Sequence, residues 1–458
     1  MVFSSMTFLT IALPLVLGLY YILPRGWRNG WLLVFSLAFY GWGGPAYLLL
    51  MLASITCNYL CGLGLGHAKA PGARRGLMAL ALAVNLGALF AFKYLGFCAR
   101  TANRLLGLGL AVPEIALPIG ISFYTFQALS YVIDVYRGDV PAQRSWVRLV
   151  LYVSFFPQLI AGPILRYDAV AAQLDGRRET LEGFWRGLKR FAAGLGKKVL
   201  IANAVAVVAD EAFSTAGLTA SAAWIGAIAY SLQILFDFSG YSDMAIGLGA
   251  MFGFTYPENF NAPYTAVTVQ DFWRRWHISL STWFRDYLYI PLGGSRRGKA
   301  RHMLNLLVVF LVTGIWHGAG FTYLVWGLYY GALLALGVLL GYRRSESMAL
   351  RALQRAATLL MVMVGWVVFR AESMTAALGY LRGLVSGDAR PLYSLDPHAV
   401  LALALGCLLA SGLPRLATDR LGERARERLS LACVPTLLVL CMLSLASGAY
   451  NPFIYFQF

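Results

Sequence analysis

Charged residues are scarce in this sequence, and their scarcity excludes an ordinary soluble fold. Of the 458 residues, 13% are charged and 59% are hydrophobic, whereas soluble proteins carry about 25% charged residues. Acidic residues are the scarcer kind, since 21 Asp and Glu stand against 38 Lys and Arg. The composition therefore predicts a polytopic integral membrane protein.

The basic excess gives a net charge of +17, which in a soluble chain would indicate nucleic-acid binding. Here most Lys and Arg residues lie in short loops between apolar segments, where they mark the cytoplasmic side of the membrane. No nucleic-acid partner is predicted. An anionic cytosolic substrate would use the same charge, and the count does not separate the two explanations.

Motifs of several enzyme classes are also missing. The sequence has no Gly-x-Ser-x-Gly nucleophile elbow, no Walker motif and no dinucleotide-binding glycine pattern. Cys57 and Cys61 share a helix face, but no His or carboxylate completes a metal site there. We predict no metal site and no disulfide framework. The apolar segment 8–23 lacks a basic n-region and a cleavage site, so it is expected to be a first span.

Apolar segments follow one another along the whole chain. We predict one membrane domain, 1–458, with roughly 10–12 transmembrane helices together with broken, re-entrant and interfacial ones. The stretch 117–135 is expected to be a broken or tilted helix, 371–397 a polar connection, and the tail 452–458 to lie outside. The main apolar segments lie at about 5–23, 31–43, 46–66, 76–97, 147–162, 181–213, 222–254, 304–341, 357–369, 398–413 and 430–447.

The stretch 304–341 contains no Asp, Glu, Lys or Arg. A straight helix of this length would be far longer than the hydrocarbon core of about 30 Å. We therefore predict two limbs that break at 314–320, where three glycines loosen the helix. Basic residues at 296–301 and 343–344 place both ends in the cytosol.

His317 lies in this break, about 20 Å of helix rise beyond Asn305 and so inside the membrane slab. Ionisable groups at that depth are costly and face a cavity or a partner. Two interpretations stay open for His317 alone. It is either a neutral imidazole bonded to a neighbouring helix or a general base in a wet cavity.

A second histidine lies in the mixed stretch 271–292. Written as one helix, this stretch places Trp273, His277 and Ser281 on the same face. An amphipathic helix on the bilayer surface would explain its aromatic and charged residues, but not the histidine among them. His317 and His277 are the best catalytic candidates. We assign substrate binding to residues around them, namely Trp316, Trp273, Arg274, Arg275, Ser281 and Asp286.

Two further features are expected to be structural. Asp237 and Asp243 interrupt the apolar run 222–254, and they are expected to be partners of arginines, because buried charges are paired or solvated. The stretch 257–264 is rich in Pro and Asn and is expected to be a constrained loop.

Five motifs resemble the membrane-bound O-acyltransferase (MBOAT) family in sequence and in order along nearly the whole chain. They are PQLIAGPILRY (157–167), FDFSGYSDMAIG (236–247), PENFNAPY (257–264), DFWRRWHISLSTWFRDYLYIPLGG (271–294) and GIWHGAG (314–320). The resemblance implies an all-α ring of spans around a central funnel. It also implies that His317 is the family's catalytic histidine and that His277 is the second histidine of its bacterial branch.

The resemblance further implies acyl transfer with no bound cofactor. The expected donor is cytosolic acetyl-CoA, and the expected acceptor is a hydroxyl on an extracytoplasmic partner or polysaccharide such as alginate. A periplasmic acetyltransferase partner, membrane lipid and the bacterial inner membrane follow from the same resemblance. D-alanyl or other acyl transfer to cell-wall polymers stays open, as does a transporter without covalent chemistry.

Overall fold

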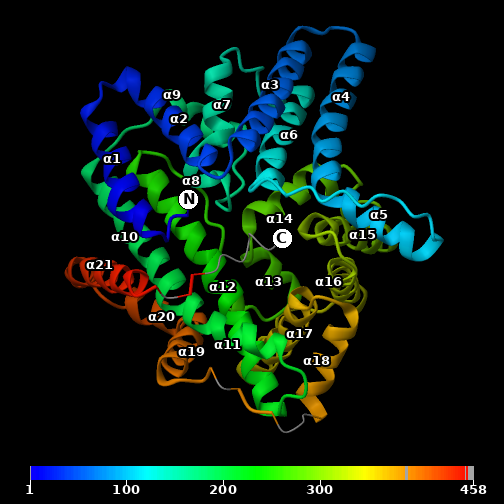
Figure 1. Ribbon diagram of the computed structural model, residues 1–458, viewed down its shortest axis with the longest axis vertical. Helices are drawn as coiled ribbons and strands as arrows, with labels where there is room; N and C mark the ends of the chain where they lie inside the picture. Colours follow the sequence, from blue (N-terminus) through cyan, green and yellow to red (C-terminus); the bar gives the residue numbers. More distant parts are fainter. Residues whose placement is uncertain (1, 387–389, 393, 449, 452–458) are drawn as a thin grey trace. The chain divides into compact units, whose positions relative to one another are not determined.

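The computed structural model describes residues 2–386, 390–392, 394–448 and 450–451 (Figure 1). Every named element within these residues is a helix, and one isolated bridge pairs Leu218 with Arg390. The predicted all-α fold is confirmed. The expected outer position of the tail 452–458 concerns residues outside the described ones.

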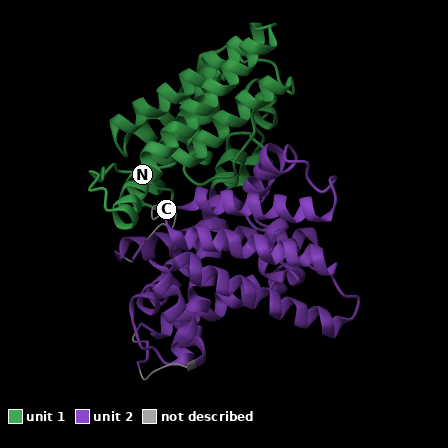
Figure 2. Cartoon of the chain, turned by 90° about the vertical axis from the view of Figure 1, so that its right-hand side faces the viewer, with its two compact units in different colours: residues 1–187, 245–256 green, residues 188–244, 257–458 purple. Residues whose placement is uncertain are grey.

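Contacts within the chain divide it into two compact units (Figure 2): residues 1–187 with 245–256, and residues 188–244 with 257–458. The prediction of one membrane domain over 1–458 stays a prediction. The helices wholly within unit 1 are η1 (Phe8–Ala12), α1 (Leu13–Ile22), α2 (Arg25–Gly41), α3 (Pro45–His67), α4 (Pro71–Leu89), η2 (Phe90–Tyr94), α5 (Leu95–Leu106), α6 (Ile121–Arg137), α7 (Trp146–Ser154), α8 (Phe156–Leu159) and α9 (Tyr167–Gly176).

Two helices, α10 (Leu181–Gly196) and α12 (Ala220–Met251), have residues in both units. The helices of unit 2 are η3 (Lys197–Ala202), α11 (Asn203–Ser214), η4 (Pro263–Thr265), α13 (Val269–Arg275), α14 (Ile278–Phe284), η5 (Arg285–Tyr289), α15 (Lys299–His317), α16 (Phe321–Leu340), α17 (Met348–Arg370), α18 (Met374–Ser386), α19 (Pro397–Ala410), α20 (Leu413–Asp419) and α21 (Glu423–Ala446).

Eight helices in the described part of the chain are long and apolar enough to cross a membrane. The number rises to nine if the bent pair α19 and α20 forms one span. The chain is therefore a multi-pass membrane protein. The prediction of roughly 10–12 spans also included shorter apolar segments. The segment at 31–43, for example, overlaps α2, which has 17 residues and ends at Gly41.

Two local predictions differ from the structure. The stretch 117–135 is not broken internally, because α6 is continuous from Ile121 and only the preceding Gly120 is left-handed, with φ of 77°. Helix α18 lies within the expected polar connection 371–397. The run 222–254, in contrast, forms one helix, α12, despite the acidic residues within it.

Continuous helices are possible around the carboxylates of α12 because both charges are compensated. Asp237 lies 2.7 Å from the amine of Lys198, and both side chains are only 2% exposed. Asp243 pairs with Arg190 at 2.6 Å and with Lys197. The expected arginine partner is confirmed for Asp243, whereas Asp237 pairs with a lysine. Neutralised in this way, the carboxylates are tolerated in an apolar helix.

The hairpin predicted for 304–341 is confirmed. Helix α15 ends at His317 and α16 begins at Phe321, so the chain breaks at 318–320. The two helices run antiparallel, because the amine of Lys299 at the start of α15 donates to the carbonyl of Leu339, 2.8 Å away at the end of α16. His317 is therefore the last residue of the first limb.

Glycines allow α15 and α16 to pack backbone against backbone. A Cβ added to Gly314 would collide with the carbonyl oxygen of Tyr323, and a Cβ added to Gly327 would collide with that of Phe310. Such close approach by small residues is a common means of joining transmembrane helices. The hairpin is thereby fixed along the half that leads to His317.

Gly327→Ala is expected to destabilise the protein by about 1–3 kcal/mol, because the added methyl must separate the two helices. Gly337→Ala is the matched control, since it lies on the same helix with open space around its Cβ position. The measurement is thermal unfolding of both variants in detergent. Equal unfolding temperatures would contradict the close-packing argument.

Candidate functional site

His317 is the last residue of α15, and aromatic rings from neighbouring helices surround it. Its side chain is buried, with 8% exposure. The imidazole lies 5.1 Å from the ring of Trp326 on α16 and 5.2 Å from that of Phe369 on α17, measured between centroids and nearly perpendicular in both cases. These contacts hold the imidazole in one place.

His277 lies between two short helices rather than within one. The predicted single helix, with Trp273, His277 and Ser281 at regular helical spacing, is wrong, because α13 ends at Arg275 and α14 begins at Ile278. His277 adopts the left-handed conformation, with φ of 44°. Non-glycine residues rarely adopt this conformation, and such strain concentrates at functional sites.

The break has a cause in the loop 257–264. The amide of Asn261 donates to the carbonyl of Arg275 at 2.9 Å, and the amide of Ile278 donates to the carbonyl of Asn259 at 3.0 Å. A continuous helix would need both of these backbone groups for its own ladder. The expected constrained loop is therefore present, and it also shapes the neighbouring segment.

The side chain of His277 is held by Asn259. Its Nδ1 lies 3.2 Å from the Oδ1 of Asn259, and its ring meets the edge of Phe238 at 4.6 Å. Only 1% of His277 is exposed. Burial disfavours the charged imidazolium and lowers the pKa of His277 to about 3. The side chain is therefore neutral at ordinary pH.

Trp316 connects the two histidines. Its ring centroid lies 6.5 Å from that of His277 and 4.8 Å from that of His317. Two residues that are far apart in the sequence thus contact one indole.

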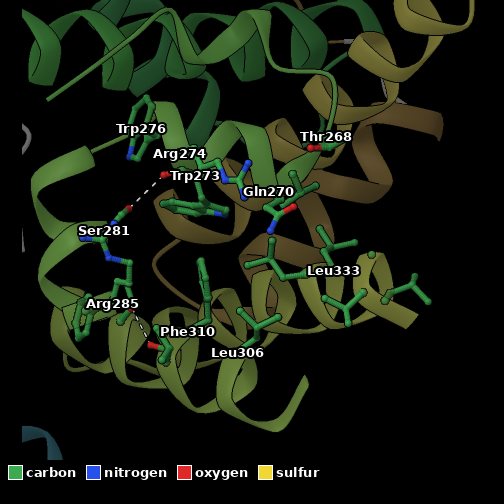
Figure 3. Close-up of a pocket in the computed structure, with 18 of the residues that line it drawn as sticks. Thr268, Gln270, Trp273, Arg274, Trp276, Ser281, Arg285, Leu306, Phe310 and Leu333 are labelled. Carbon is green, nitrogen blue, oxygen red and sulfur yellow. Dashed lines mark hydrogen bonds between the residues drawn. The ribbon is translucent and has the colours of Figure 1, made fainter. Parts of the chain in front are cut away.

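A cavity of about 860 Å³ is lined by both histidines. Figure 3 shows Trp273 and Gln270 of α13 on one side of this cavity, opposite Leu306 and Phe310 of α15. Along α15 the lining extends from Leu306 to His317, which is about 16 Å of helix rise. The cavity therefore extends from His317, at the end of α15, to the half of α15 that begins at Lys299.

The predicted binding residues divide into two groups. Trp273, Arg274 and Ser281 line the cavity together with the histidines. Ser281 also donates a hydrogen bond of 3.3 Å to the carbonyl of Trp273, drawn in Figure 3. The structure thus brings these residues together although they do not share one helix.

The other three predicted residues do not belong to the cavity lining. Arg275 pairs with Asp271 at 2.9 Å, and Asp286 pairs with Arg285 at 2.7 Å. Trp316 is packed between rings, as described above. Their roles in binding stay predictions.

Sequence reasoning missed several lining residues. Thr313 lies four residues before His317, so helical spacing could have identified it. Gln270 and Arg343 also line the cavity, although in the sequence Arg343 serves only as a marker of topology. Within the residues that the structure describes, no three His, Cys, Asp or Glu side chains group as a metal site.

Comparisons with known proteins agree with the motifs. The model of the membrane-bound O-acyltransferase family, MBOAT, matches residues 141–376. "Probable alginate O-acetylase AlgI" of Pseudomonas putida is 41% identical over the full length of both chains. "Peptidoglycan O-acetyltransferase" of Helicobacter pylori is 36% identical over 87% of this chain and 82% of its own. "Teichoic acid D-alanyltransferase" of Bacillus subtilis is 28% identical over 47% of this chain and 58% of its own.

The fold and the site together define a multi-pass helical membrane protein with a cavity that two histidines and Arg274 line. The motifs and the full-length similarity then identify its family. This chain belongs to the membrane-bound O-acyltransferase family, and it is an O-acyltransferase.

The left-handed conformation of His277 leads to a stability prediction. His277→Gly is expected to be more stable than His277→Ala by about 1 kcal/mol, because only glycine adopts this conformation without steric cost. At Ser281, within α14, the order should reverse, since glycine is the poorer helix former. Thermal unfolding of the four variants in detergent tests this. If the alanine variant is the more stable one at both positions, no strain is stored at His277.

Proposed function

We propose that this O-acyltransferase takes an acetyl group from cytosolic acetyl-CoA and passes it to a hydroxyl on the extracytoplasmic side. The proposal rests on one observation: His317, His277 and Arg274 line the same cavity, which extends along the hairpin. A transferase needs donor and base to meet in one site, and this cavity supplies the space for both.

The donor would bind through its phosphates at the basic part of the cavity. Arg274, Arg285 and Arg343 line this part of the cavity. A guanidinium group can bind two oxygens of one phosphate through two parallel N–H donors. Arg274 is exposed and forms no ion pair with any described residue. Its charge is therefore available to a ligand, in contrast to that of Arg275.

The sidedness follows from the basic loops. Residues 296–301 and 343–344 flank the hairpin, and the positive-inside rule assigns them to the cytosol. From this end the thioester would extend along an apolar wall that includes Leu306, Phe310 and Leu333. The distance of about 16 Å to His317 is then the length that the reactive arm must cover.

In the transfer step the acceptor hydroxyl oxygen attacks the thioester carbonyl carbon, and His317 takes the hydroxyl proton. A C–O bond forms as the C–S bond breaks, and the departing thiolate receives the proton from His317. The products are the acetyl ester and free coenzyme A, and the histidine returns to its neutral form. His277 assists by orienting the reacting groups or relaying the proton.

The acceptor would be a secreted polysaccharide such as alginate, or a periplasmic acetyltransferase partner that modifies the polymer. The similarity to proteins named for alginate and peptidoglycan O-acetylation supports acetyl as the group transferred. D-alanyl transfer is the alternative, and its named relative is similar over only 47% of this chain. The corresponding location is the bacterial inner membrane, in contact with its lipids.

Replacing His317 tests the reaction and its direction together. Membrane vesicles of both orientations receive acetyl-CoA carrying a labelled acetyl group, and alkali-labile label is measured as ester. Inside-out vesicles should form ester while sealed right-side-out vesicles should not. His317→Ala should lower the rate by about 10²-fold or more, since a general base is lost.

Expression level and detergent stability of His317→Ala are the controls for folding. A near-normal rate in this variant would exclude His317 as the base. Ester formation in sealed right-side-out vesicles would reverse the proposed direction.

Arg274→Ala and Arg275→Ala form a matched pair that tests donor binding. Arg274→Ala should raise the apparent KM for acetyl-CoA, most strongly at low ionic strength, because a free cation in the cavity is lost. Arg275→Ala should leave the KM unchanged, since its charge is engaged with Asp271. Equal effects of the two substitutions would show that general basicity, rather than the cavity, attracts the donor.

A further inference from the structure

Resting on the proposed function, we propose that Asn259 is a positioning residue that fixes the tautomer of His277. Its side-chain oxygen holds the proton of His277 on Nδ1, so that Nε2 carries the lone pair for the reaction. The loop 257–264 is thus part of the active site although none of its residues lines the cavity.

The donors of Ser279 show which side-chain atom of Asn259 is the oxygen. The backbone amide of Ser279 lies 3.2 Å from the Oδ1 of Asn259, and the Ser279 hydroxyl lies 2.9 Å from the same atom. A backbone N–H can only donate, so the atom that faces it must be the amide oxygen. Because this oxygen can only accept, the His277 nitrogen at 3.2 Å must also carry a proton.

The tautomer follows from the charge state. A neutral imidazole has one protonated nitrogen and one acceptor nitrogen. The His277 side chain is neutral because of its burial, as described above. With the proton on Nδ1, the lone pair resides on Nε2, and His277 can accept a proton or a hydrogen bond at that nitrogen only.

The backbone bonds of the loop fix the ring in the same orientation. Asn259 and Asn261 bond the backbone on both sides of His277, at Ile278 and Arg275, and hold it in the left-handed conformation. Phe238 then contacts the imidazole at 88° and restricts its rotation. Asn259 itself is completely buried. Asn259 therefore helps to hold the backbone of His277 through its carbonyl and sets the tautomer through its side chain.

The test compares Asn259→Leu, which removes the acceptor at similar volume, with Asn259→Asp, which keeps an oxygen there. We expect Asn259→Leu to lower kcat roughly tenfold or more, as the loss of an orienting partner commonly does. The KM for acetyl-CoA should stay within about twofold, because Asn259 does not line the cavity. Asn259→Asp should retain most of the activity.

Ser279→Ala is the matched control. It removes one donor to the same oxygen and leaves the bond to His277 in place, so kcat should remain near the original value. All rates are divided by the amount of folded protein that elutes as one species in detergent. Asn259→Ala replaces Asn259→Leu if the larger residue prevents folding.

A combination with His277→Gln separates positioning from a merely structural role. If Asn259 acts through His277, adding Asn259→Leu to His277→Gln should cause little further loss of kcat. A further loss as large as in the original background would overturn the proposal, as would an unchanged kcat in Asn259→Leu. If the unaltered protein forms no ester from labelled acetyl-CoA, the proposed function itself fails, which is a different outcome.

Discussion

The close packing of α15 against α16 is the constraint on which the candidate site depends. Gly314 and Gly327 let the two backbones meet, and no larger side chain fits between them. This contact fixes the hairpin just before His317 and aligns the α15 and α16 walls of the cavity. Separating the helices would therefore move His317, the proposed base, and widen the cavity. A short-range steric requirement thus controls the geometry of the candidate site.

The loop 257–264 supplies a second constraint of the opposite kind. This loop keeps α13 and α14 from forming one continuous helix. Its backbone bonds the N–H and C=O groups that such a helix would need for its own hydrogen bonds. The conformation of His277 is locally unfavourable and persists because the surrounding bonds determine it. Departures from local preference are expected at functional sites, where stability is given up for orientation.

The causes of these two features differ in their distance along the chain, and this explains which of them the sequence predicts. The hairpin 304–341 was predictable because its cause is local: a long run without charge, with glycines in the middle. The break at His277 was not, because a helical pattern covers 271–292 and the competing hydrogen bonds come from Asn259 and Asn261, earlier in the chain. The same limit applies to Arg274 and Arg275. They are adjacent in sequence, but only the structure shows which one lines the cavity and which one pairs with Asp271.

The net charge of +17 leaves open whether the basic residues serve topology or bind a ligand, and the charges of unit 2 bear on that question. Lys198, which is buried, has Asp237 as its acidic partner, and the partly exposed Arg190 has Asp243. Arg274 and Arg343 line the cavity, and neither forms an ion pair within the described ranges. The positive-inside rule requires basic loops, but it does not require cations that face a cavity. Their placement supports the proposal of an anionic donor, which would compensate them while it is bound.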